Sequence, residues 1–183
     1  GHLRKNVCTV KKDKSGAIHD AATIIVYRTK PTNQIFMVRR HSKASFMANA
    51  MVFPGGRLDE ADGDPRWLSH VEVVTDTDED NTAAPWPLHV AAIRETFEEA
   101  GVLLANREGK ALEPNSPVGR VLFGDARRAL NAGDTSFLSL CEEYQLNLTL
   151  PCLTYYSRWI TPVIEKRRFD ARFFSAHGPA LQT

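Results

Sequence analysis

Three glutamates, Glu95, Glu98 and Glu99, constrain this chain more than any other feature of its sequence. Residues three and four positions apart share one face of an α-helix, so the spacing predicts a helix that presents the three carboxylates together. The opposite face of that helix is apolar, and its residues are Val90, Ile93, Phe97 and Ala100. We therefore expect a helix over residues 89–100 that buries one side and ends at Gly101.

Such an acidic face has two interpretations, a solvated surface or a metal site. Adjacent carboxylates repel one another, which costs an isolated helix a few tenths of a kcal/mol per pair. A hard divalent cation removes this repulsion because it prefers oxygen ligands. Taken alone, the pattern is more typical of a solvated face. Here Arg94 directly precedes the acids, and the double glycine Gly55-Gly56 follows an apolar, strand-like stretch. Glycine lets the backbone approach a metal or a phosphate closely, so this context favours a metal and phosphate site.

The two segments together resemble the Nudix signature, split by an insertion. In that signature a glycine is followed after five residues by an acid, and a seven-residue spacer precedes the arginine-led glutamate motif. Gly56 takes the glycine position and Asp62 the acid position, where glutamate is usual, and residues 63–93 replace the spacer. Thr96 occupies a position that is usually apolar.

In the family, the first acid pairs with the arginine that precedes the metal ligands. In this chain that partner of Arg94 is Asp62, Asp59 or Glu60, and the sequence does not choose among them.

An interrupted signature of this kind is similar to the acyl-coenzyme A diphosphatase subgroup of the Nudix family. The segments that carry this similarity are 46–47, 52–56, 58–59, 93–104, 159–162 and 168–174. The resemblance implies an α/β class, a Nudix-type α/β/α sandwich with a mixed sheet, in one domain over residues 1–183 with an insertion at about 63–87. It also implies a strand and a closing helix after Phe174, and we leave open whether these are missing.

The resemblance implies a metal-dependent hydrolase with Mg²⁺ or Mn²⁺ as its cofactor. The substrate would be a nucleoside diphosphate linked to another moiety, and the subgroup makes coenzyme A or an acyl-coenzyme A the leading candidate. ADP-ribose and dinucleotides are alternatives within the same chemistry. A Nudix-like domain that binds a ligand without catalysis is the alternative from another class.

The same resemblance assigns the residues of the site. The metal ligands would be the Gly55 carbonyl and the carboxylates of Glu95, Glu98 and Glu99. Catalysis would depend on Glu98, Glu99 and Arg94, with one of the two glutamates also acting as base and Arg94 holding the acids in register.

Three basic residues upstream of the signature are candidates for substrate binding. Arg39, Arg40 and Lys43 offer charge-assisted hydrogen bonds to phosphate oxygens. A plain basic surface is the competing interpretation.

Length and charge narrow the class of protein. A chain of 183 residues suits one domain, and a formal net charge of +1 argues against a broad surface for nucleic acid or membrane. We expect a small-molecule nucleoside diphosphate derivative as the partner and a cytoplasmic location, with a homodimer left open.

Local patterns predict the remaining elements. Strands are expected at residues 21–28, 34–40, 50–53, 102–104, 154–160 and 169–174, and further helices at 117–132 and 135–144. Polar and acidic residues predict that the insertion is an exposed, mobile loop, with Trp67 and Trp86 as the residues that could anchor it.

Overall fold

The computed structural model describes residues 17–40, 49–72, 84–179 and 182. Its main feature is a mixed five-stranded sheet built around one long strand, β1. The five strands are β1 (Ile18–Arg28), β2 (Gln34–Ile35), β5 (Gly55–Arg57), β9 (Thr154–Ile160) and β10 (Arg168–His177). Strand β1 pairs in parallel with β10 and antiparallel with β2 and β5, while β9 pairs antiparallel with β10.

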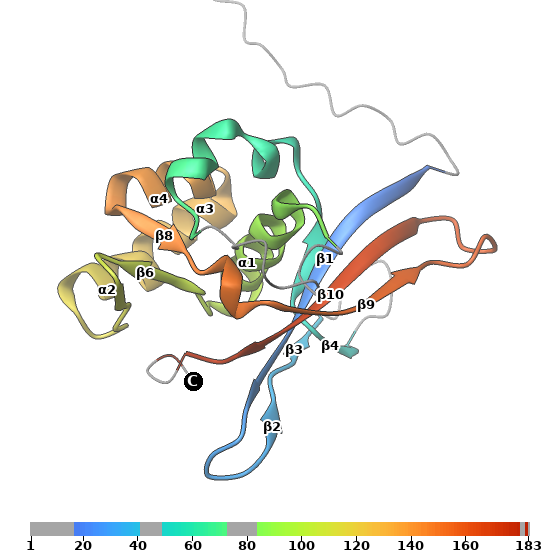
Figure 1. Ribbon diagram of the computed structural model, residues 1–183, viewed down its shortest axis with the longest axis horizontal. Coiled ribbons are helices and arrows are strands. Elements are labelled where there is room, and N and C mark those ends of the chain that lie inside the picture. Colours follow the sequence, from blue (N-terminus) through green and yellow to red (C-terminus); the bar gives the residue numbers. More distant parts are fainter. Residues whose placement is uncertain (1–16, 41–48, 73–83, 180–181, 183) are drawn as a thin grey trace, which may run out of the picture.

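Helix α1 (Trp86–Ala100) packs on this sheet, and the α-helices gather on one side of its long strands (Figure 1). The alternate residues Ala22, Ile24 and Val26 of β1 are almost fully buried, as expected for the strand face that a helix covers. None of the helices in the described ranges is long and apolar enough to span a bilayer.

The predicted helix is confirmed, and it begins three residues early at Trp86 because Pro87 is tolerated in a first turn. Gly101 ends it with a φ of 69°, a conformation that favours glycine. Phe97 is fully buried, with its ring centroid 5.8 Å from that of Phe123 and 6.0 Å from that of Phe137. The helix is therefore covered by the sheet and also by a second layer.

That second layer contains a three-stranded sheet and the remaining helices. The strands are β6 (Ala105–Arg107), β7 (Lys110–Ala111) and β8 (Leu146–Leu148). The predicted helices are confirmed as α2 (Pro117–Val121), the π-helical turn η4 (Leu122–Ala126), α3 (Arg127–Ala132) and α4 (Phe137–Tyr144).

Two strand predictions need correction. Residues 102–104 form no strand, because the Leu103 N–H and C=O bond to the Gln182 side chain at 2.8 and 3.1 Å rather than to a neighbouring strand. The strand expected at 34–40 is divided into β2 and β3 (Val38–Arg39), and β3 pairs with β4 (Met51–Val52). The strand divides because β2 pairs only with the end of β1, at residues 27–28, and β5 pairs with residues 21–23 along the same edge of β1.

The insertion is more ordered than its composition predicts. It continues from the 3-10 turn η1 (Glu60–Gly63) into η2 (Pro65–Ser69), where Trp67 is only 1% exposed. The Trp67 Nε1–H donates to the Ala61 carbonyl at 2.9 Å, and its ring lies 5.6 Å from that of Phe137. Most residues of this part are exposed, as predicted, while Trp67 is buried and anchors it. Residues 73–83 lie outside the described residues.

Candidate active site

Arg94 and Asp62 form a buried ion pair beneath the acidic face of α1. The Arg94 Nε and Nη2 atoms donate to the two Asp62 carboxylate oxygens at 2.8 and 2.9 Å. The two side chains are 9% and 1% exposed. Burial opposes the charge on Arg94, but hydrogen bonding and ion pairing with Asp62 outweigh it and raise the Arg94 pKa. Asp62 is therefore the main partner that the sequence left open, while Asp59 lies further away at 3.6 Å.

Arg94 also reaches the carboxylates that follow it along the helix. Its Nη1 atom lies 2.8 Å from Glu95 Oε1 and 3.4 Å from Glu98 Oε2. Its Nη2 atom donates to the Arg57 carbonyl at 3.0 Å. One guanidinium thus links η1, β5 and two of the three glutamates, an arrangement that holds the acids in register.

The double glycine lies in strand β5. In β5, Gly55 and Gly56 pair with Thr23 and Ala22 of β1. A Cβ atom on Gly56 would lie 2.3–2.4 Å from the Glu95 carboxyl group, so glycine at this position leaves the space that the carboxyl group occupies. The Gly55 N–H donates to Glu99 Oε2 at 3.2 Å. The strand therefore forms one wall of the carboxylate cluster.

Burial makes the negative charge of these glutamates unfavourable. It raises the pKa of Glu95 to about 7, in spite of the opposing charge of Arg94. It also raises the pKa values of Glu98 and Glu99, although Arg94 opposes the shift at Glu98 and the Gly55 N–H opposes it at Glu99. A cluster of this kind would be stabilised by additional positive charge.

The donor chemistry fits a hard divalent cation, since it consists of carboxylate oxygens beside a strand that glycine keeps open. Within the described ranges, no three acidic, histidine or cysteine side chains already stand close enough to hold one ion. Glu95 and Glu98 instead turn to Arg94, and Glu99 to Gly55.

The C-terminal end of α1 is held by residues that the sequence did not indicate. Arg127 donates from Nε to the Phe97 carbonyl at 2.7 Å and from Nη2 to the Glu98 carbonyl at 2.8 Å. Asn131 also donates to the Glu98 carbonyl, at 3.2 Å. These bonds fix the helix turn that carries Glu98 and Glu99, and no local sequence pattern could have revealed them.

A cavity of about 200 Å³ opens beside the Arg94–Asp62 pair. Its lining includes Asp59, Glu98 and residues 135–138, which lead into the start of α4.

Only part of the predicted phosphate-binding set can be placed. Arg40 is exposed, and its positive charge acts on Glu99 strongly enough to oppose the rise in that carboxyl's pKa. Arg39 is exposed on β3. Lys43 lies outside the described residues.

This domain is of the Nudix type. It combines a mixed sheet with a buried helix that carries clustered glutamates, and an arginine of that helix pairs with Asp62. The family model described as the NUDT19 Nudix domain matches residues 70–177. The chain therefore belongs to the Nudix family, in the group that this domain represents.

Similar proteins agree with this assignment. The chain is 31% identical over 178 residues to the acyl-coenzyme A diphosphatase NUDT19 of Gallus gallus, and 31% identical over 180 residues to that of Homo sapiens. Each match covers 77% of this chain and 47% of the relative, so the chain spans about half of those proteins. The crystal structure of a NUDIX hydrolase from Alicyclobacillus acidocaldarius matches with a TM-score of 0.70 and 28% identity, covering 90% of this chain and 72% of that one. The predicted fold is confirmed.

The raised pKa of Glu95 predicts how stability depends on pH when metal is chelated. The folded state keeps a proton up to about pH 7, whereas the unfolded state loses it near 4.5. The contribution of protonated Glu95 to the free energy of unfolding is therefore fully present below pH 4.5 and is lost as the pH rises through 7. We expect Glu95→Gln, which cannot ionise, to exceed the parent in free energy of unfolding at pH 8 by on the order of 2 kcal/mol. Urea unfolding with EDTA at pH 4 and pH 8 measures this, and an equal difference at both values would contradict it.

Proposed function

We propose that this chain is a cytoplasmic, divalent-metal-dependent hydrolase of a nucleoside diphosphate linked to a second group, with coenzyme A or an acyl-coenzyme A as its leading substrate. The observation that carries the proposal is the cluster of three glutamates beside the glycines of β5, in which Arg94 contacts Glu95 and Glu98 and the Gly55 N–H donates to Glu99. The names of the NUDT19 relatives support the substrate.

The residues of the cluster have complementary roles in this proposal. Glu95, Glu98 and Glu99, with the Gly55 carbonyl, would hold Mg²⁺ or Mn²⁺. A bound cation of this kind neutralises phosphate charge and lowers the pKa of a coordinated water. Glu98 or Glu99 would accept the proton of the attacking water.

Basic residues upstream of β5 in the sequence would bind the substrate phosphates. Arg40 lies close enough to Glu99 to influence it and would contact the diphosphate, with Arg39 and Lys43 as further candidates. Water adds to one phosphorus atom and the anhydride P–O bond to the other phosphate breaks. The two halves of the substrate are released as phosphate monoesters.

The specificity constants of coenzyme A, ADP-ribose and a dinucleotide, measured under the same Mg²⁺ conditions, test the substrate assignment. We expect coenzyme A to be preferred, because the NUDT19 relatives carry the name acyl-coenzyme A diphosphatase. A clear preference for ADP-ribose would reject coenzyme A and keep the diphosphatase chemistry. Binding without turnover of any of the three would favour a ligand-binding domain.

A further inference from the structure

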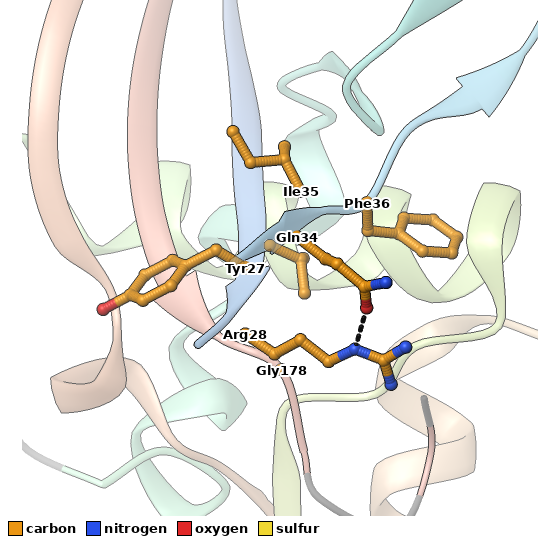
Figure 2. Close-up of a pocket in the computed structure, with 7 residues that line it drawn as sticks. Tyr27, Arg28, Gln34, Ile35, Phe36 and Gly178 are labelled. Carbon is orange, nitrogen blue, oxygen red and sulfur yellow. Dashed lines mark hydrogen bonds between the residues drawn. The ribbon is translucent and has the colours of Figure 1, made fainter. Parts of the chain in front are cut away.

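A second cavity lies at the end of β1, outside the carboxylate cluster (Figure 2). It has a volume of about 390 Å³, and its lining consists of Val26, Tyr27, Arg28, Gln34, Ile35, Phe36 and Gly178. Backbone hydrogen bonds tie its walls together: the Phe36 N–H donates to the Val26 carbonyl and the Gly178 N–H to the Tyr27 carbonyl, both at 2.8 Å. The cavity is thus built from the β1–β2 hairpin and the segment after β10.

Three side chains on one side of the hairpin give this cavity its chemistry. Arg28 and Gln34 are cross-strand partners whose side chains run toward each other, and Phe36 lies on the same side (Figure 2). Tyr27 points the opposite way, where its ring lies 5.5 Å from that of His177. The cavity therefore combines a guanidinium, an amide and an aromatic ring.

The charge on Arg28 is not matched by an acid within the described residues. Its Nε donates to the Gln34 side-chain oxygen, which is a neutral acceptor. Arg66, Arg94 and Arg158, by contrast, each form ion pairs with carboxylates. Gln34 fixes the guanidinium plane through Nε and leaves the two terminal nitrogens to face another acceptor. This fork geometry suits a phosphate.

The cavity also lies in line with the carboxylate cluster. Gly55, which bonds to Glu99, pairs with Thr23 of β1, five positions before Arg28. At about 3.3 Å per residue, the backbones of these two positions are roughly 17 Å apart along the strand. The long Arg28 side chain can bring its guanidinium closer to the cluster than its backbone. Arg28 shares the strand face of Val26, which is the face that α1 covers. Both sites are therefore on the same side of the sheet.

We propose that this cavity binds the phosphorylated nucleoside end of the substrate, with Arg28 contacting a phosphate monoester on the ribose and Phe36 packing against the base. The proposal rests on the proposed function, since it concerns a substrate whose diphosphate lies at the glutamates. Coenzyme A carries such a monoester at the ribose 3′ position, whereas ADP-ribose does not. Arg28 then selects coenzyme A, and Gln34 is its positioning residue.

Kinetics with coenzyme A and 3′-dephospho-coenzyme A test this assignment. Arg28→Ala should lower kcat/KM for coenzyme A by about 10- to 100-fold, mainly through KM, because one charge-assisted contact is lost. Its kcat/KM for the dephosphorylated substrate should stay within about twofold of the parent, since that contact is absent there. Arg120→Ala, an exposed arginine on α2, is the matched control and should change neither value. Equal losses on both substrates, or no loss, would overturn the assignment.

Direct binding separates this inference from the proposed function. Calorimetry with adenosine 3′,5′-bisphosphate should show binding to the parent that weakens at least about tenfold in Arg28→Ala. If the parent hydrolyses neither substrate, the proposed function fails, yet this binding difference would still support the cavity. Equal binding by parent and variant, or no binding to either, would overturn it.

Discussion

Replacing Glu98 or Glu99 with glutamine is expected to lower kcat for diphosphate hydrolysis at least about a hundredfold while the fold stays intact. Glutamine keeps the size of the side chain and an oxygen that can accept the Gly55 N–H bond, but it removes a carboxylate. Neutral side chains here also relieve an unfavourable burial of charge, since burial raises the pKa of both glutamates. The melting temperature should therefore stay level or rise.

Steady-state kinetics with Mg²⁺ and thermal melts of the same preparations check this prediction. Glu143→Gln, an exposed glutamate of α4, is the matched control and should leave both measurements unchanged. If both Glu98→Gln and Glu99→Gln retain parental activity, the catalytic assignment is wrong.

Arg94→Ala is expected to destabilise the fold strongly as well as to abolish turnover. The substitution leaves the Asp62 carboxylate, 1% exposed, without its buried partner. Breaking a buried pair in this way typically costs about 3–5 kcal/mol, because one charge stays desolvated. Arg66→Ala is the control, because that arginine pairs with Asp64 on the surface and should matter little.

A double-mutant cycle measures the pair itself. Asp62→Ala combined with Arg94→Ala should lose less stability than the sum of the single changes, with a coupling energy of about 1–3 kcal/mol. Urea unfolding of the four proteins gives this value. Additive losses would show that Arg94 and Asp62 do not act as a pair.

Local patterns carried the prediction of α1 and the long strands. The helix follows from the spacing of its glutamates and apolar residues, β1 follows from its β-branched run, and β9 and β10 follow from their aromatic residues. These signals are contained within each segment, so the sequence alone was enough.

Long-range packing decided what the sequence left open. Asp62 and Arg94 are 32 positions apart in the sequence. The chain after Asp62 folds back, so that the Trp67 side chain bonds to the Ala61 carbonyl and holds the turn in which Asp62 meets Arg94. Gly55 and Gly56 have low strand propensity, yet β1 recruits them into the sheet. Arg127 contacts α1 from a helix 30 positions away from Phe97. None of these contacts has a signature in its own segment.

The most direct test of the account is to identify the products formed from coenzyme A by mass spectrometry. With Mg²⁺ or Mn²⁺, the full chain should release adenosine 3′,5′-bisphosphate and 4′-phosphopantetheine in equal amounts, and EDTA should stop the reaction until metal is restored. Product formation that survives exhaustive chelation, or no cleavage of coenzyme A or any other nucleoside diphosphate derivative, would contradict it.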